Sequence, residues 1–334
     1  MARIVRTDRE LEMQGVDAAL RAAGHEVVLL PDGVSEDDLA RALGDAELLL
    51  MCYTPVTARV IAAAPRLKGI VKYGVGVDAI DIEAAKARGI AVVNIPEYAE
   101  ETVAEGAFAL MLALAKKLKP IQREMDTKGW AWPNSQWLGL DLAGKTLGLV
   151  GVGRIGSSMA RMAHGFRMRV LGFSPNSLLP PGVEKRQQLQ EMLTECDFVS
   201  IHCVLNAETR GMIGEREIAA MRPSAYLVNT ARGAIVDEAA LLRALQARRI
   251  AGAALDVYSQ EPLAKAGHPL SALYAMDNVI LWPHLTFYTA EAMQRLEQET
   301  LERCSEILEG RPVLVKSTDP RLRSQTTGVR FPEP

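Results

Sequence analysis

Short apolar runs alternate with amphipathic stretches along most of the chain. In the N-terminal part, the apolar runs lie near residue 4 and at residues 26–30, 47–51, 69–73 and 90–94. The stretches between them are rich in alanine, and one of them, IEAAKARG, contains the glycine that is typical of a helix C-terminus. Short buried strands that alternate with amphipathic helices predict β–α–β units and a parallel sheet.

The same alternation begins again after residue 145. Its apolar runs lie at residues 146–150, 169–173, 197–203, 225–230, 252–257 and 278–284. We therefore expect an α/β protein with two doubly wound parallel sheets. The segment between the two sets, residues 102–118, is too apolar for a simple surface helix, and we expect it to be a hinge or a dimer element.

Two further segments stand outside this alternation. Three of the four tryptophans lie in WAWPNSQWLG, residues 130–139, and we expect them to pack against a neighbouring segment or subunit. Residues 291–310 predict a long helix after the last strand. The tail that follows contains Pro320, Pro332 and Pro334 and is too polar to fold alone, so we expect it to be disordered or to dock on a partner.

Composition and charge exclude several classes of protein. The formal net charge of −3 provides no basic field for nucleic acid. No apolar run reaches the roughly 18 residues of a membrane span, and MARIVRTDRE at the start does not resemble a signal peptide. The cysteines show neither metal-ligand spacing nor a disulfide framework. We expect a cytoplasmic protein with reduced thiols, no metal site, and no nucleic-acid or membrane partner.

The glycine motif GVGRIG, residues 151–156, follows an apolar strand and opens a helix. In that context it predicts a dinucleotide site. Gly151 would permit the tight turn, Gly153 would let the backbone approach a pyrophosphate, and Gly156 would allow close packing of helix and strand. The N-terminus of the helix would face the anion.

The choice of cofactor depends on the end of the next strand. NAD sites normally place Asp or Glu there, but this chain has Ser174, eighteen residues after the glycine motif. Without that carboxylate a 2′-phosphate is not repelled, and Ser174, Asn176 and Ser177 would donate hydrogen bonds to it. Arg154 is the nearest cation in the sequence, and Arg186 lies further on. We expect NADP to be preferred over NAD, with dual specificity as the alternative.

Four chemistry-bearing side chains follow later strands. Arg232 lies in NTARGAIVDEAAL, Asp256 and Glu261 lie in ALDVYSQEP, and His284 lies in LWPHLTFYT. Open α/β sheets bind their ligands at the carboxyl ends of strands. An arginine, a carboxylate and a histidine there suit the reduction of a 2-oxo acid. Arg232 would hold the carboxylate and polarise the carbonyl, His284 would donate the proton as hydride arrives, and Glu261 would stabilise the imidazolium.

Five motifs occur in the order KYGVGVDAID, GVGRIG, NTARGAIVDEAALLRAL, LDVYSQEP and PH. Together they resemble the D-isomer-specific 2-hydroxyacid dehydrogenases over nearly the whole chain. The resemblance implies a Rossmann coenzyme domain at residues 99–284, inserted into a flavodoxin-like substrate domain that is split between residues 1–98 and 285–334. It also implies an NAD(P)-dependent oxidoreductase that acts on 2-hydroxy and 2-oxo acids, and a homodimer.

The resemblance implies roles for individual residues. Arg232, Glu261 and His284 fall on the family's catalytic positions, and Asp256 falls on the acid that holds the nicotinamide side of the cofactor. The further cofactor contacts that it implies are Thr102, Arg154, Ile155, Cys203, Thr209, Thr230 and Ala231. The segment whose backbone N–H groups would bind the substrate carboxylate comprises Tyr73, Gly74, Val75 and Gly76.

We expect other roles for Lys72 and His202, which lie next to these implied site residues in the sequence. Lys72 faces the same rim as Tyr73, and we expect it to be a solvated charge or one that does not touch the ligand directly. His202 ends a strand, and we expect it to be structural. The family resemblance places Cys203 at the start of the loop on the adenine side, where its departure from the usual proline would reshape the pocket.

Several aromatic residues of this chain resemble those of the D-lactate and branched 2-hydroxyacid members of the family. Tyr53, Tyr98 and Tyr288 would line the substrate pocket, and Phe287 would add to its apolar wall. The sequence does not choose among pyruvate, hydroxypyruvate, glyoxylate and larger 2-oxo acids. The alternatives within the family are a hydroxypyruvate or glyoxylate reductase and a phosphoglycerate dehydrogenase-like enzyme. The alternative from another class is a dinucleotide-sensing, corepressor-like interaction protein.

Overall fold

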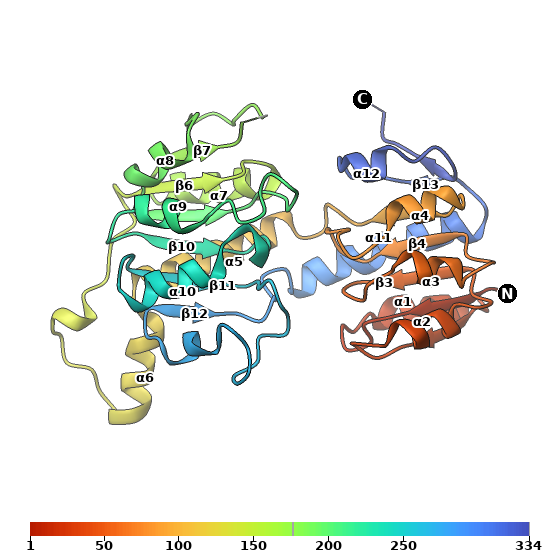
Figure 1. Ribbon diagram of the computed structural model, residues 1–334, viewed down its shortest axis with the longest axis horizontal. Coiled ribbons are helices and arrows are strands. Elements are labelled where there is room, and N and C mark those ends of the chain that lie inside the picture. Colours follow the sequence, from red (N-terminus) through yellow and green to blue (C-terminus); the bar gives the residue numbers. More distant parts are fainter. Residues whose placement is uncertain (176, 334) are drawn as a thin grey trace. The chain divides into compact units, whose positions relative to one another are not determined.

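The chain divides into two compact units in a computed structural model that describes residues 1–175 and 177–333. Unit 1 consists of Met1–Ala99 and Thr289–Pro334, and unit 2 consists of Glu100–Tyr288. Both are α/β units with parallel sheets (Figure 1). The predicted fold class is therefore confirmed. The expected domain boundaries, after residues 98 and 284, lie close to these divisions.

Unit 1 contains a five-stranded parallel sheet with the order β2-β1-β3-β4-β5. Its strands are β1 (Arg3–Arg6), β2 (Glu26–Leu29), β3 (Leu48–Met51), β4 (Gly69–Lys72) and β5 (Ala91–Asn94). Strands β3, β4 and β5 are buried along their whole length, which explains why they read as continuous apolar runs. The order 2-1-3-4-5 is that of flavodoxin-like sheets.

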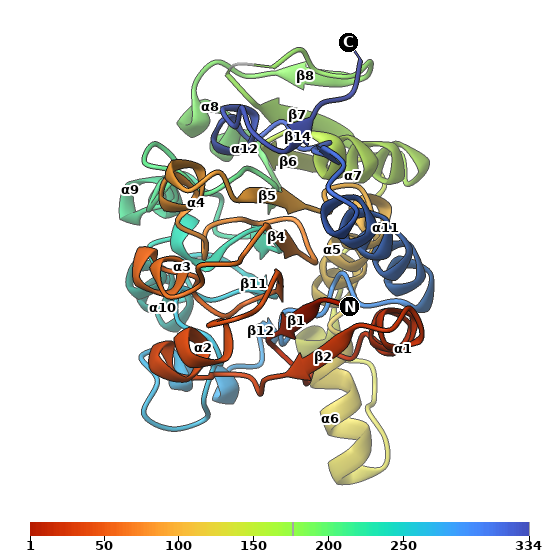
Figure 2. The same cartoon turned by 90° about the vertical axis from the view of Figure 1, so that its right-hand side faces the viewer.

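Helices cover both faces of this sheet (Figure 2). One layer contains α2 (Glu36–Ala42), α3 (Ala58–Ala62) and α4 (Ile82–Ala87). The other contains α1 (Gln14–Ala22) and α11 (Ala290–Leu308), which pack side by side. The long C-terminal helix is thus confirmed, and it returns the chain to unit 1.

The polar tail folds onto unit 1, and the expectation that it is disordered is wrong. It forms β13 (Val313–Leu314), α12 (Pro320–Arg323) and β14 (Val329–Arg330). The side chain of Gln325 makes two hydrogen bonds to the backbone of Val92, which lies in β5. Val315 and Leu322 are fully buried. A few anchored side chains therefore compensate for the low apolar content. Pro334 lies outside the described residues.

Unit 2 contains a seven-stranded parallel sheet with the order β12-β11-β10-β9-β6-β7-β8. Its strands are β6 (Thr146–Val150), β7 (Arg169–Phe173), β8 (Val183–Lys185), β9 (Phe198–Ile201), β10 (Tyr226–Asn229), β11 (Gly252–Leu255) and β12 (Val279–Leu281). Numbered within this sheet, the order is that of a Rossmann fold with a seventh strand. The topological switch point lies between β6 and β9, so the loops after these two strands are neighbours. The short strand β8 carries two charged residues, and its sequence gave no apolar signal.

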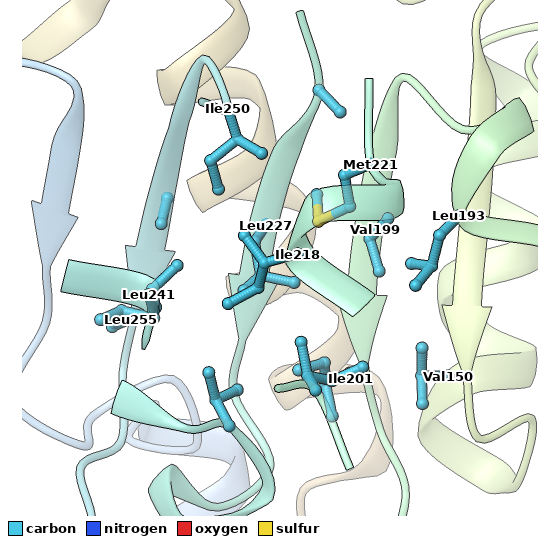
Figure 3. Packing of buried hydrophobic residues seen from close by; sticks show 14 of the residues in the cluster. Val150, Leu193, Val199, Ile201, Ile218, Met221, Leu227, Leu241, Ile250 and Leu255 are labelled. Atoms are coloured by element: carbon cyan, nitrogen blue, oxygen red, sulfur yellow. The ribbon is translucent and has the colours of Figure 1, made fainter. Parts of the chain in front are cut away.

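Two layers of helices pack on the seven-stranded sheet. On one face, Ile218 and Met221 lie at α9 (Glu215–Ala220), over Val199 of β9 and Leu227 of β10 (Figure 3). The same face carries α8 (Leu189–Glu195) and α10 (Glu238–Gln246). The other face carries α5 (Glu100–Ala115) and α7 (Arg154–Gly165). The apolar segment 102–118 is therefore largely a core helix of unit 2, followed by the separate helix α6 (Leu118–Lys128).

Candidate active site

The three glycines of the motif have different surroundings. Gly151 has a φ of 90°, and a Cβ atom on it would lie 2.5 Å from the backbone N of Cys203. A Cβ atom on Gly156 would lie 2.4 Å from the carbonyl oxygen of Gly151. A Cβ atom on Gly153 would meet no heavy atom within 4 Å, so this glycine faces open space at the N-terminus of α7. The first-turn N–H groups and the helix dipole favour an anion there.

Other polar groups around this loop fit a dinucleotide. The hydroxyl oxygen of Thr230, just after β10, is buried and lacks a hydrogen-bond partner within the described residues. A buried polar atom of this kind normally has a partner. Arg154 forms an ion pair with Glu100 at 3.1 Å, so a protein carboxylate already binds its guanidinium. The loop is therefore shaped for a pyrophosphate, and the hydroxyl of Thr230 lies at the carboxyl end of β10, two strands away from β6 in the same sheet.

The remaining predicted cofactor contacts lie in loops or at helix starts of unit 2. Thr209 donates its hydroxyl to the carbonyl of Val204 at 2.7 Å and so closes the loop after β9. The N–H of Ala231 donates to the side chain of Asn229. Thr102 is buried in the first turn of α5, and Ile155 packs partly against the apolar core. The cofactor contacts of these four residues stay predictions.

The segment after β7 lies beside a cation of β8 that the sequence reasoning missed. Lys185 Nζ donates to the carbonyl oxygens of Pro175, at 3.1 Å, and Ser177, at 3.2 Å. The ammonium group therefore lies beside the segment that follows Ser174. Arg186, in contrast, binds Glu195 and Glu184. The predicted phosphate donor Asn176 lies outside the described residues.

His284 and Glu261 form a hydrogen-bonded pair. Nδ1 of His284 lies 2.9 Å from Oε2 of Glu261, and the two side chains are 25% and 32% exposed. The other carboxylate oxygen, Oε1, accepts the N–H of Tyr258 at 2.9 Å. An ionised carboxylate can only accept, so the proton of this hydrogen bond belongs to Nδ1. A proton that the ring exchanges with a ligand would then pass through Nε2.

Neighbouring groups stabilise the negative charge of Glu261. Burial raises the pKa of Glu261, but the hydrogen bond and charge of His284, the N–H of Tyr258 and the charge of Arg232 together bring this pKa below its ordinary value. The carboxylate therefore remains ionised at neutral pH. A fixed negative charge beside an imidazole favours the imidazolium form.

Asp256 holds the backbone just after His284. Its carboxylate accepts the N–H of Leu285 at 2.8 Å and both the N–H and the hydroxyl of Thr286, at 3.2 and 2.5 Å. The residue is fully buried. His284 itself has a φ of 57°, an uncommon conformation for a residue with a side chain. The three hydrogen bonds to Asp256 stabilise this conformation from the following residues.

Arg232 reaches the same end of the sheet because its neighbour is a glycine. A Cβ atom on Gly233 would lie 2.0 Å from the carbonyl carbon of Tyr258, so the turn after β10 packs directly on the loop after β11. The side chain of Asn229 donates to the carbonyl of Arg232 at 3.0 Å. This close approach brings the charge of Arg232 to Glu261. Sequence reasoning missed the roles of Asn229, Gly233 and Tyr258.

Aromatic rings follow His284 in unit 2. The ring of Phe287 lies edge-on to the imidazole of His284, with centroids 6.3 Å apart, and edge-on to Tyr288 at 5.8 Å. Phe287 is buried, and Tyr288 is about half exposed. These rings provide an apolar surface beside the histidine, as the sequence predicts for a pocket wall.

In the predicted carboxylate-binding segment of unit 1, the carbonyls of Gly74 and Val75 point towards the end of β5. The carbonyl of Gly74 accepts the N–H of Ile95, and the carbonyl of Val75 accepts the side chain of Asn94 at 2.6 Å. In a trans peptide the carbonyl and the N–H point in opposite directions. The N–H groups of Val75 and Gly76 therefore point away from β5, in the arrangement that a bound anion needs.

The side chains around this segment have other partners. Tyr73 is fully buried, and its hydroxyl donates to the carbonyl of Thr7 at 2.6 Å, so only its backbone remains for a ligand. Tyr98 is buried and its carbonyl accepts the side chain of Arg295. Tyr53 is 43% exposed. Lys72 is 6% exposed, and the expectation of a solvated charge is wrong.

The structure also bears on the remaining sequence predictions. Nε2 of His202 lies 2.9 Å from the hydroxyl of Ser200, and burial lowers the pKa of His202 to about 4. Its neutral ring agrees with a structural role. Among the described residues, no group of His, Cys, Asp and Glu side chains could hold a metal ion. Across residues 1–175 and 177–333, no helix has the length and apolar content needed to span a membrane.

Comparisons with known proteins agree with this fold. A model of the D-isomer specific 2-hydroxyacid dehydrogenase, NAD binding domain, matches residues 108–286. The chain is 41% identical over 266 residues to a glyoxylate reductase of Korarchaeum cryptofilum, covering 77% of this chain and 78% of the relative. It is 38% identical over 285 residues to a D-3-phosphoglycerate dehydrogenase of Methanocaldococcus jannaschii. That alignment covers 83% of this chain but 53% of the relative, so the chain spans about half the length of that enzyme.

A solved structure resembles the whole fold. The D-lactate dehydrogenase of Aquifex aeolicus, in complex with NAD and lactic acid, has a TM-score of 0.81 and 32% sequence identity, covering 92% of this chain and 96% of that one. The fold and the family match define an oxidoreductase with an NAD-binding Rossmann domain. The chain belongs to the D-isomer specific 2-hydroxyacid dehydrogenases.

Proposed function

We propose that the protein is an NAD(P)-dependent 2-oxo acid reductase, or D-2-hydroxyacid dehydrogenase in the reverse direction, with His284, Glu261 and Arg232 as its catalytic residues. The observation that carries the proposal is the hydrogen bond of 2.9 Å between His284 and Glu261. The charge of Arg232 helps to lower the pKa of Glu261, which supports Arg232 as the third group.

Each of the three groups has a distinct task in the proposed reaction. The planar guanidinium of Arg232 binds the substrate carboxylate and polarises the adjacent carbonyl. Nε2 of His284 donates a proton to the carbonyl oxygen during reduction and accepts it back in the reverse direction. Glu261 orients the imidazole through Nδ1 and stabilises its charged form. Asp256 keeps His284 in place through Leu285 and Thr286.

A nicotinamide dinucleotide supplies or accepts the hydride when it is bound. The groups that would hold its pyrophosphate are the backbone at Gly153 and the first-turn N–H groups of α7. NADP is the preferred cofactor in this proposal, with dual specificity as the alternative. Ser174 replaces the acid that would repel a 2′-phosphate, and the ammonium of Lys185 lies beside the same segment.

The proposed substrates are small 2-oxo acids. The named relatives include a glyoxylate reductase, which makes glyoxylate and hydroxypyruvate the first compounds to test. The apolar rings of Phe287 and Tyr288 agree with an uncharged substrate side chain. A phosphorylated substrate is the alternative within the family, because a D-3-phosphoglycerate dehydrogenase is also among the relatives.

A substrate panel tests the proposal. Glyoxylate, hydroxypyruvate, pyruvate, 2-oxoisocaproate and 3-phosphohydroxypyruvate are assayed with NADH and with NADPH. We expect turnover of at least one small, unphosphorylated 2-oxo acid, with a higher kcat/KM for NADPH. Turnover of 3-phosphohydroxypyruvate alone would show that the substrate is phosphorylated. No turnover with either cofactor would contradict the proposal that the protein is a reductase.

We also propose that the protein is a homodimer. Four large apolar residues are exposed at and after α6: Leu118, Trp130, Trp132 and Leu138, with exposed fractions of 56%, 58%, 75% and 71%. Large exposed apolar side chains that gather in one segment mark interaction sites. Analytical ultracentrifugation should find a dimer, and Trp132→Glu should weaken it.

A further inference from the structure

Lys72 is a buried cation without a carboxylate partner. It ends β4 and is 6% exposed. Its Nζ donates to Sγ of Cys52 at 3.0 Å, and Cys52 is equally buried. Within residues 1–175 and 177–333, no carboxylate forms an ion pair with Lys72. A thiol is a weak hydrogen-bond acceptor, so it compensates little for the removal of the ammonium group from water.

The nearby carboxylate of Asp8 is committed to other groups. It accepts the N–H of Cys52, at 2.7 Å, the N–H of Thr54, at 3.1 Å, and the hydroxyl of Thr54, at 2.8 Å. The hydroxyl of Thr7 also donates to it. Asp8 therefore holds the loop after β3 and does not pair with the ammonium group of Lys72.

The ammonium group lies against the carboxylate-binding segment. A Cβ atom on Gly74 would lie 2.8 Å from Nζ of Lys72, so the ammonium group lies directly against the backbone of Gly74. On its other side, Nζ lies 5.4 Å from the ring centroid of Tyr53. Gly74 immediately precedes Val75 and Gly76, whose N–H groups point away from β5. A positive charge and two oriented donors thus occur within one short segment of unit 1.

We propose that Lys72 attracts the carboxylate of the 2-oxo acid to the N–H groups of Val75 and Gly76. This inference rests on the proposed function for the identity of the ligand. The negative charge of the ligand compensates for a buried positive charge that the protein leaves unpaired. Lys72 is a positioning residue, because its charge acts through the segment that receives the carboxylate. Uncharged Cys52 keeps the ammonium group in place without neutralising it.

Two substitutions and a control test the proposal by kinetics. Lys72→Met removes the charge, Lys72→Arg keeps it, and Lys68→Met removes an exposed charge just before the same strand. We expect Lys72→Met to raise KM for glyoxylate about tenfold, the effect of one charge in a partly buried site, with a smaller change in kcat. Lys72→Arg should restore most of the affinity. Lys68→Met should match the wild type, and KM for the dinucleotide should not change.

The range of substrates identifies which anionic group Lys72 serves. If Lys72 serves the carboxylate that all 2-oxo acids share, glyoxylate, pyruvate and hydroxypyruvate should lose affinity by the same factor. A loss confined to 3-phosphohydroxypyruvate would overturn the assignment in favour of the far end of the substrate. Lys72→Gln, which keeps a donor for Cys52, is measured in parallel in case the methionine variant does not fold.

Calorimetric titration with oxamate, a carboxylate that is not reduced, separates this inference from the proposed function. We expect Lys72→Met to bind oxamate about tenfold more weakly than the wild type in the presence of saturating dinucleotide. Such a loss supports the anion site even if no 2-oxo acid is turned over. Unchanged oxamate affinity and unchanged KM in the Lys72 variants would overturn the inference while leaving the reductase proposal intact.

Discussion

Nδ1 of His284 lies 2.9 Å from Oε2 of Glu261, although the two residues are 23 positions apart in the chain. They belong to loops that follow the adjacent parallel strands β11 and β12. Parallel pairing brings the carboxyl ends of these strands together. The N–H of Tyr258 donates to Glu261, and the carboxylate of Asp256 accepts the N–H of Leu285, so both loops are held in place.

This pair predicts different effects for its two members. His284→Ala should abolish turnover and leave dinucleotide binding nearly intact. Glu261→Gln keeps the shape but removes the charge, so we expect kcat to fall about 10- to 100-fold. Loss of dinucleotide affinity in His284→Ala, measured by fluorescence titration, would contradict the assigned role.

The glycine loop predicts opposite outcomes for two alanine substitutions. A Cβ atom on Gly153 meets open space, so Gly153→Ala should fold normally and raise KM for the dinucleotide by about tenfold. A Cβ atom on Gly156 meets the carbonyl of Gly151 at 2.4 Å, so Gly156→Ala should lower Tm. Thermal unfolding and steady-state kinetics check both. An unchanged KM in Gly153→Ala would show that the pyrophosphate does not pass this glycine.

The segment after β7 predicts how the cofactor preference can be changed. Ser174→Asp restores a carboxylate that repels a 2′-phosphate, so the ratio of kcat/KM for NADPH over NADH should fall. Lys185→Met should lower the same ratio by removing a cation. Lys265→Met, which removes an exposed lysine elsewhere in unit 2, serves as the control. Ratios that stay unchanged in both variants would show that this segment does not select the cofactor.

The buried ring of His202 should make the free energy of unfolding depend on pH. Burial lowers its pKa to about 4 from an ordinary value of 6.5, so between these values the unfolded chain binds more protons than the folded one. Stability should therefore fall as the pH decreases from 6.5 towards 4, by about 1–3 kcal/mol from this residue. His202→Asn should flatten the dependence of Tm on pH in this range, and His164→Asn, at an exposed position, is the control. Equal slopes in the wild type and His202→Asn would contradict the assignment.

Much of the fold could be predicted because its signals are local. Each buried parallel strand is a short apolar run, and Gly151 and Gly156 of GVGRIG lie where a Cβ atom would meet the backbone. The parts that sequence reasoning missed depend on contacts between distant segments. Lys185 of β8 donates hydrogen bonds to backbone carbonyls after β7, and the side chain of Gln325 binds the backbone of β5. Neither interaction has a local sequence pattern, because each joins a single side chain to a distant backbone group.

The sequence by itself determined the α/β class, the glycine loop and the types of residue that follow the later strands. These depend on the period of apolar positions and on the conformations that glycine permits. Only the tertiary structure decided that Glu261 binds His284, that Asp256 stabilises the unusual backbone of His284, and that Lys72 is buried. The physical reason is that burial and hydrogen-bond partners arise when strands pair and loops pack, and a residue's type does not specify either of them.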